Sequence, residues 1–223
     1  MKTFSDSREE RFAAFRQKMV SVQLYARGIR NERVLAAMAK VPRHLFIAEE
    51  FRQDAYEDHP LPIGVGQTIS QPYIVAFMLE VLSLEGSEKV LEVGTGSGYV
   101  TALLAELVRQ VYSVERISAL ANQAQAMLQG LGSTNVRIRT GDGSQGWVEY
   151  APYDAIVVSA AARQVPQALL EQLRDQGRIM IPIGSPEAQE LVLVRKIAGQ
   201  LAMTRLEGCR FVPLIAEPGK GQV

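Results

Sequence analysis

The sequence has few of the residues that hold metal ions or form disulfides. Its 223 residues include one cysteine, Cys209, and two histidines, His44 and His59. A single cysteine cannot form a disulfide within the chain, and these three residues cannot build a Cys/His metal cluster. We therefore expect no bound metal, and the near absence of cysteine is typical of a cytoplasmic protein.

An excess of charge of one sign and long apolar segments are missing as well. The 24 basic and 24 acidic side chains cancel, so the chain lacks the basic excess typical of proteins that bind nucleic acids or anionic membranes. The longest apolar runs, Ile74–Leu79 and Ala155–Ala162, fall far short of the roughly 18 residues that a membrane span needs. Met1–Arg11 also lacks the apolar segment of a signal peptide. We expect a cytoplasmic monomer with no nucleic-acid or membrane partner.

What the chain does contain suits a single globular domain. Apolar residues make up 47% and charged residues 22% of the sequence, which allows a substantial core. Apolar spacing near 3.6 residues predicts a helix over residues 8–27, ended by Gly28. A second helix is predicted over Glu32–Lys40, with Asn31 as its N-cap. Two helices therefore precede the rest of the fold.

Residues 59–71 differ in composition from the segments on either side. They are rich in proline, glycine and small polar side chains, which predicts a loop with defined turns. Pro72 suits the first turn of a helix that continues over Tyr73–Leu82. The apolar residues of that helix lie nearly all around it, which implies that it is buried.

From residue 89 onward, apolar strands alternate with helices. Strands are predicted at Lys89–Val93, Gln110–Glu115, Val136–Thr140, Asp154–Ser159 and Arg178–Ile183, and helices at Tyr99–Leu107, Ser118–Leu131 and Pro166–Arg174. Strands separated by helices form a mostly parallel sheet with helices on both faces. The last two runs, Glu190–Lys196 and Leu201–Glu207, have no helix between them and predict an antiparallel hairpin. The predicted fold is a doubly wound, Rossmann-like α/β sheet with N-terminal helices and a C-terminal hairpin.

A glycine-rich loop follows the first of these strands and leads directly into a helix. Its residues are Gly94-Thr95-Gly96-Ser97-Gly98. Glycine lets a ligand approach the backbone closely, and the position between a strand and a helix is the one that a nucleotide-binding loop requires. The alternative is that these glycines only form a tight turn.

The charge around this loop favours one class of cofactor. Glu92 lies two residues before the first glycine, where it would repel the pyrophosphate of a dinucleotide, and the spacing is not that of the dinucleotide motif. S-Adenosylmethionine presents an ammonium, a sulfonium and a ribose, for which a nearby carboxylate is favourable. We therefore predict S-adenosylmethionine as the cofactor and Glu92, Gly94, Thr95, Gly96 and Gly98 among the residues that bind it.

Two more acidic residues end the next two strands. Glu115 ends Gln110–Glu115 and is placed to accept hydrogen bonds from both ribose hydroxyls; a surface pair with Arg116 is the alternative. Asp142, followed by Gly143, ends the third strand, where a carboxylate can accept a hydrogen bond from the adenine amino group. A turn-forming Asp-Gly pair is a strong alternative at that position. Acidic residues at the ends of successive strands favour a shared cofactor-binding role more strongly together than any one of them does alone.

These motifs, taken with others, resemble the protein-L-isoaspartate O-methyltransferase family. The resemblance runs in order from about residue 20 to residue 215, and its segments are 61–72 (LPIGVGQTISQP), 90–99 (VLEVGTGSGY), 112–116 (YSVER), 141–143 (GDG), 153–158 (YDAIVV) and 210–214 (RFVPL). The glycine loop is shared by many methyltransferases, whereas residues 67–72 (QTISQP) are much more specific to this family.

The resemblance implies a repair enzyme. Its methyl group would pass from S-adenosylmethionine, leaving S-adenosylhomocysteine, to the free carboxylate of an L-isoaspartyl residue in damaged proteins or peptides. The ester then closes to a succinimide that partly hydrolyses to aspartate. The resemblance also implies that Ser70 is the active-site residue, that Thr68 lies by the cofactor, and that Glu115 and the Asp142-Gly143 pair contact its ribose and adenine.

The same interpretation divides the single domain into four parts. These are an N-terminal helical cap (1–58), an active-site loop (59–72), a cofactor-binding core (73–215) and a flexible tail (216–223). Arg163 and Ser144 depart from residues common in the family, at the rim of the peptide groove and near the adenine. From the residues alone, the favoured role for Ser70 is to cap the helix that follows it, and the resemblance is what favours the active-site role.

Other functions remain open at this point. A methyltransferase acting on nucleic acid or a small molecule would use the same loop, but the chain has no basic groove motif and no base-gripping Asn-Pro-Pro-Tyr. A domain that binds the cofactor without turnover is the other possibility.

Overall fold

The N-terminal region forms helices where the sequence predicts them. The computed structural model describes residues 4–216, and side chains from Arg8 onward. Helix α1 (Phe4–Lys18) continues through a π-helical turn (Met19–Leu24) and a 3-10 turn (Tyr25–Arg27) to Gly28, whose φ of 104° ends it. Helix α2 (Glu32–Lys40) begins at Asn31, whose side chain accepts from the backbone N–H groups of Arg33 and Val34. Two 3-10 turns, Arg43–Phe46 and Glu49–Asp54, complete the cap.

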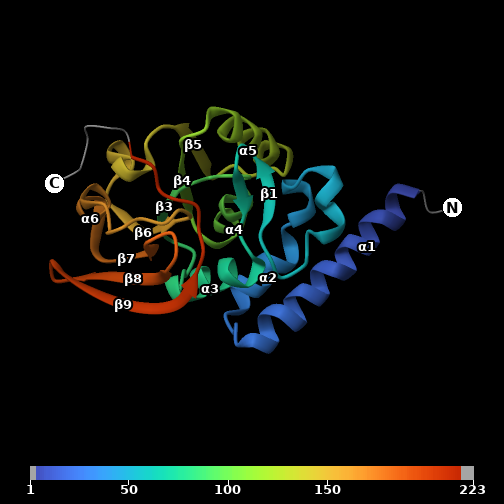
Figure 1. Ribbon diagram of the computed structural model, residues 1–223, viewed down its shortest axis with the longest axis horizontal. Helices are drawn as coiled ribbons and strands as arrows, with labels where there is room; N and C mark the ends of the chain where they lie inside the picture. Colours follow the sequence, from blue (N-terminus) through green and yellow to red (C-terminus); the bar gives the residue numbers. More distant parts are fainter. Residues whose placement is uncertain (1–3, 217–223) are drawn as a thin grey trace.

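A seven-stranded sheet forms the centre of the molecule, in the order β5-β4-β3-β6-β7-β8-β9. Its elements are β3 (Lys89–Val93), α4 (Tyr99–Leu107), β4 (Gln110–Glu115), α5 (Ser118–Gly130), β5 (Val136–Thr140), β6 (Tyr153–Val158), α6 (Gln167–Gln172), β7 (Leu173–Gly184), β8 (Gln189–Ile197) and β9 (Gln200–Cys209). Strands β3 to β7 pair in parallel, and β8 pairs antiparallel with both of its neighbours. The predicted doubly wound sheet and its terminal hairpin are confirmed. Figure 1 shows the N-terminal helices and the β8–β9 hairpin at opposite ends of the molecule.

The strand order places a crevice beside β3. From β3 the chain first adds β4 and β5 on one side and then crosses to β6 on the other. Ligands of open α/β sheets bind at such a switch point, outside the carboxyl ends of the strands. The glycine loop follows β3 and therefore lies at this position.

Residues 59–71 contain a small hairpin that the sequence does not predict. Strands β1 (Leu61–Gly64) and β2 (Gln67–Ile69) pair antiparallel, with Leu61 opposite Ile69. Val65 and Gly66, at φ values of 52° and 69°, make the turn between them, in the left-handed conformation that two-residue hairpin turns require. A β-branched valine is unusual there, so this turn lacks the Asn-Gly signal by which hairpins are recognised. Helix α3 (Pro72–Leu82) follows.

Two predicted boundaries in the second half are wrong. The helix expected over Pro166–Arg174 is shorter, because Leu173 pairs with Tyr153 and already belongs to β7. The strand expected at Arg178–Ile183 therefore begins five residues earlier. The polar stretch 174–177 (RDQG) has no strand pattern of its own, and it forms an irregularity between the Leu173–Tyr153 and Arg178–Ala155 pairs.

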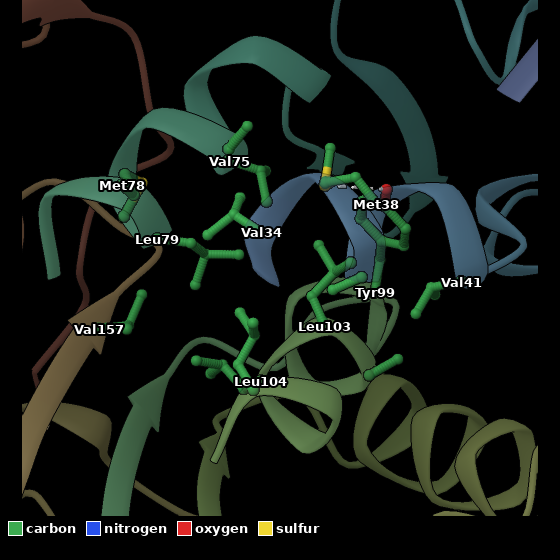
Figure 2. Close-up of a cluster of buried hydrophobic side chains, with 14 of the residues drawn as sticks. Val34, Met38, Val41, Val75, Met78, Leu79, Tyr99, Leu103, Leu104 and Val157 are labelled. Carbon is green, nitrogen blue, oxygen red and sulfur yellow. Dashed lines mark hydrogen bonds between the residues drawn. The ribbon is translucent and has the colours of Figure 1, made fainter. Parts of the chain in front are cut away.

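Both faces of the central strands β3, β4 and β6 are buried. Alternate residues of each strand point to opposite faces, so Val90 and Val157 join a core cluster with α2, α3 and α4, whereas Leu91 and Val158 join a second cluster on the other face. Figure 2 shows part of the first cluster, with Met38 of α2, Leu79 of α3 and Leu103 of α4 among its side chains. Helices α2 and α3 thereby fix the N-terminal cap to the core. No helix within residues 4–216 has the length and apolarity to cross a membrane, and the tail predicted for 216–223 lies, apart from Ala216, outside the described residues.

Candidate active site

A cavity of about 170 Å³ lies at the carboxyl ends of the central strands. Its walls come from the β1–β2 hairpin and the residues after it, the glycine loop, the end of β4, the residues after β6, and the C-terminal segment 212–215. Of the predicted site residues, those that line it are Thr68, Ser70, Gly94, Thr95, Gly96, Glu115 and Gly143, and those that do not are Glu92, Gly98 and Asp142. The topology therefore brings segments far apart in the sequence to one space.

Hydrogen bonds from the loop backbone to two residues at the end of β4 hold the glycine loop in place. Gly94 N–H donates to Val114 O at 2.9 Å, and Gly96 N–H donates to Glu115 Oε2 at 2.9 Å. Gly94 and Gly96 have φ values of 91° and 54°, which strain any residue other than glycine. A Cβ on Gly96 would lie 3.5 Å from Ile63 Cδ1, so the β1–β2 hairpin packs directly over the loop.

Glu115 lies beside the glycine loop, and its side chain is nearly buried. It is 6% exposed, and its second oxygen, Oε1, accepts from Ile117 N–H at 2.9 Å. Each oxygen still has a lone pair beyond its one backbone hydrogen bond. The side chain can therefore hold the loop and accept hydrogen bonds from a polar ligand in the cavity at the same time.

Glu92 lies behind the loop and not in the cavity. It has the same orientation on β3 as Val90, toward α4, and is fully buried. Its Oε2 accepts from Thr101 Oγ1 and Ser113 Oγ, both at 2.6 Å, and Ser113 Oγ is 2.5 Å from Thr95 Oγ1. Glu92 thus reaches the cavity only through Ser113 and Thr95. The sequence suggested that Glu92 contacts a cofactor directly. Its orientation toward α4 does not allow that contact.

The burial of Glu92 predicts an unusual dependence of stability on pH. Burial raises its pKa to about 7, against the hydrogen bonds from Ser113 and Thr101 that lower it. Because the folded pKa lies above the unfolded value, the stabilising contribution is complete below pH ~4.5 and is lost as pH rises through about 7. Between pH 4.5 and pH 8 we expect the wild-type protein to lose up to about 3 kcal/mol of unfolding free energy that Glu92→Gln keeps.

Urea unfolding of both proteins at pH 4.5 and pH 8 measures this difference. The exposed Glu171→Gln serves as a control and should follow the wild-type pH dependence. An equal pH dependence for Glu92→Gln and wild type would contradict the assignment of the raised pKa to Glu92.

Gly98 and Asp142 have structural partners that explain them. Gly98 is the N-cap of α4, and a Cβ there would lie 3.0 Å from Ala124 Cβ of α5, so it permits close helix packing. Asp142 Oδ1 accepts from Ser144 N–H at 2.8 Å and from Ser144 Oγ at 2.7 Å. The structure therefore contains the turn that the alternative interpretation of Asp142 predicts. Gly143 is the residue of this turn that lines the cavity. A Cβ on Gly143 would lie 2.4 Å from Val93 Cγ1, so only glycine fits.

Ser70 is one of the residues that line the cavity. It is half-buried and lies between β2 and α3. The N-cap of α3 is Gln71, and no side chain caps that helix, so the capping alternative for Ser70 is wrong. Among the described side chains and backbone groups the Ser70 hydroxyl has no hydrogen-bond partner, which leaves it available to a ligand. Thr68, exposed on β2, also lines the cavity.

The C-terminal segment closes the cavity from a third side. Ala161 N–H donates to Val212 O at 2.8 Å, and Leu214 N–H donates to Ala161 O at 2.7 Å, so this segment extends the sheet beyond β6. The buried Gln189 side chain accepts from Phe211 N–H at 2.7 Å and donates to Phe211 O at 3.2 Å. These four bonds fix the segment without a regular strand.

Among the lining residues that sequence reasoning missed are Ser159 and Ala160, which directly follow β6. Ser159 N–H donates to Val93 O at 2.9 Å, and its Cβ would lie 3.5 Å from a Cβ on Gly94. Both line the cavity. The signal was present, because small residues directly after the apolar run 153–158 end the strand next to β3. Among the described residues, no group of His, Cys, Asp and Glu is arranged to hold a metal ion.

The whole arrangement matches one family. The model of the protein-L-isoaspartate(D-aspartate) O-methyltransferase family matches residues 15–219, which covers most of the chain. The chain belongs to this family. The protein-L-isoaspartate O-methyltransferase of Syntrophus aciditrophicus (strain SB) is 54% identical over 213 residues, which cover 94% of this chain and 98% of that one.

Solved structures agree with this membership. One named protein-L-isoaspartate O-methyltransferase has a TM-score of 0.81 at 29% identity, over 89% of this chain and 65% of that chain. A structure from Plasmodium falciparum, described as a protein-L-isoaspartate O-methyltransferase in complex with S-adenosyl-L-homocysteine, has a TM-score of 0.79 at 29% identity, over 90% of this chain and 98% of that chain. The family resemblance found in the sequence is confirmed.

Proposed function

We propose that this protein transfers the methyl group of S-adenosylmethionine to the free carboxylate of L-isoaspartyl residues in damaged proteins and peptides. The observation that carries the proposal is the cavity itself. Its lining includes the hydroxyl-bearing residue Ser70, the glycine loop, and the nearly buried carboxylate of Glu115, which accepts a hydrogen bond from that loop at Gly96. Membership of the family supplies the same activity independently.

The residues at one end of the cavity fit the cofactor. Gly143 leaves no room for a side chain beside Val93, and Gly94 and Gly96 expose their backbone to the cavity. Glu115 has lone pairs free for ribose hydroxyls. In the proposal, Gly94, Thr95, Gly96, Glu115 and Gly143 hold the cofactor, and Thr68 lies beside it. S-Adenosylmethionine supplies an electrophilic methyl group there and leaves as S-adenosylhomocysteine.

The acceptor needs no base. A carboxylate has a reference pKa near 4, so at neutral pH it is already ionised and is the nucleophile. The carboxylate would take the methyl group that the cofactor supplies, and the electron pair of the broken carbon–sulfur bond would stay on sulfur. Ser70 donates a hydrogen bond to the carboxylate and holds it in line with that bond, which is where positioning lowers the barrier.

An open groove next to the cavity suits a peptide substrate. Pro213 and Leu214 line both the cavity and this neighbouring groove of about 1560 Å³, which also contains the exposed Arg163. A peptide bound along the groove would reach Ser70 across segment 212–215. In the proposal the protein acts as a cytoplasmic monomer on such substrates, with no nucleic-acid or membrane partner, as the balanced charge suggests.

Paired peptides test this function. The protein is incubated with labelled S-adenosylmethionine and two peptides of one sequence, which contain either L-isoaspartate or ordinary aspartate. Methylation of the isoaspartyl peptide, with base-labile label, is the expected result. Equal labelling of both peptides, or of neither, would refute the proposal.

A further inference from the structure

A buried arginine of the N-terminal cap reaches the residue that carries the site's free hydroxyl. Arg43, in the 3-10 turn Arg43–Phe46, is 0% exposed. Its Nη2 donates to the backbone oxygen of Ser70 at 2.8 Å, and its Nε donates to Ala55 O at 2.7 Å. The two carbonyls belong to residues 15 positions apart in the chain. One planar guanidinium thus ties the active-site loop to the cap.

Arg43 also contacts the cavity wall on a second side. Its guanidinium lies 4.9 Å from the centre of the Tyr99 ring, and Tyr99 is another residue that lines the cavity. Tyr99 OH is held in turn by Met38 Sδ of α2, at 3.5 Å. Arg43 therefore lies between two cavity-lining residues, in contact with both.

The residue after Ser70 is held by the same cap. Gln71 Nε2 donates to Asp58 Oδ2 at 2.9 Å, and Asp58 pairs with Arg27. The Arg27 guanidinium in turn lies 3.6 Å from the centre of the Tyr73 ring, at the start of α3. Two consecutive residues of the loop are thus fixed by two separate contacts from residues 27–58.

Fold stability is a poor explanation for Arg43. Burial lowers its pKa to about 10, so the side chain is still charged at neutral pH, and its Nη1 has no hydrogen-bond partner among the described residues. A buried cation with an unsatisfied donor costs free energy, and apolar residues of similar volume are often as good or better for stability. An apolar residue at position 43 could not make the hydrogen bond to the Ser70 carbonyl.

We propose that Arg43 is a positioning residue for methyl transfer, which fixes the backbone of Ser70 so that its hydroxyl points at the acceptor carboxylate. This inference rests on the proposed function, in which Ser70 orients the substrate. Arg43 itself is fully buried and is not among the residues that line the cavity. Its effect therefore passes through Ser70, and this dependence can be measured.

Arg43→Met tests the proposal, because methionine is long, flexible and apolar. Turnover is expressed per cofactor site, counted by titration with S-adenosylhomocysteine, so that unfolded protein does not contribute. We expect kcat for an isoaspartyl peptide to fall about 10- to 100-fold, with the KM for the peptide and the Kd for S-adenosylhomocysteine within about threefold of wild type. Arg43→Lys, which keeps a donor, is expected to recover part of the loss.

Two further comparisons separate positioning from general damage. Arg16→Met is the matched control, since Arg16 also donates to a cap carbonyl, Ala39 O at 2.7 Å, but touches no cavity residue; it should keep wild-type kcat. In a Ser70→Ala background, Arg43→Met should cost less than about threefold, because the hydroxyl it positions is gone.

Wild-type kcat in Arg43→Met, or an equal loss with and without the Ser70 hydroxyl, would overturn the proposal. A variant without titratable cofactor sites would also overturn it, because Arg43 would then serve folding alone. The wild-type assay decides the proposed function separately, since every comparison here is made against a measured wild-type turnover.

Discussion

Ser70→Ala is expected to lower the turnover of an isoaspartyl peptide about 10- to 150-fold and to leave the Kd for S-adenosylmethionine unchanged. A hydrogen bond to a charged group contributes roughly 1.5 to 3 kcal/mol, and each 1.4 kcal/mol is a factor of ten in rate. The Ser70 hydroxyl has no partner within the described part of the chain, so its removal leaves no buried group unsatisfied. The loss therefore reports on the substrate alone.

Steady-state kinetics and calorimetric titration of the cofactor measure the two quantities. The exposed Ser21→Ala is the control, since Ser21 Oγ donates only to Lys18 O on the surface of the cap. If Ser70→Ala turns over peptide at the wild-type rate while folded, Ser70 does not orient the acceptor.

Glu115→Ala has the second large expected effect, on cofactor binding. We expect the Kd for S-adenosylmethionine to rise about 10- to 100-fold, because the variant loses the acceptor for the ribose and also the hydrogen bond that holds Gly96 N–H. Glu115→Gln should lie between Ala and wild type, since an amide oxygen can still accept from Gly96 but the charge and one acceptor are gone.

Titration calorimetry on the three proteins gives these constants, and a thermal melt without cofactor shows whether each is folded. Glu106→Gln, on the exposed surface of α4 where Glu106 pairs with Lys40, is the control. Unchanged affinity in folded Glu115→Ala would mean that the carboxylate only braces the loop.

Much of the fold can be predicted because local signals and tertiary structure agree there. Strand β3 and helix α4 have the predicted bounds, since an apolar run, a glycine loop and a helical pattern follow one another directly. Asn31 caps α2 as predicted because capping depends only on neighbouring residues. Where a distant partner sets the conformation, as where Leu173 of β7 pairs with Tyr153, the local sequence pattern gives no signal of the strand.

The candidate site divides in the same way. The glycines and Glu115 follow from their place at strand ends, but the orientation of Glu92 depends on the alternation of β3, which points it at α4. Its charge suggested a ligand, whereas its neighbours are hydroxyl groups. Arg43 gives no signal in the sequence, because its partner Ser70 lies 27 residues away and is reached only in the folded chain.

The most direct test is a crystal structure with S-adenosylhomocysteine and an isoaspartyl peptide bound together. The account predicts ribose oxygens within hydrogen-bond distance of Glu115, adenine beside Gly143, and the isoaspartyl carboxylate between the sulfur and Ser70 Oγ. A nucleoside bound outside the cavity, or a carboxylate that makes no contact with Ser70, would contradict it.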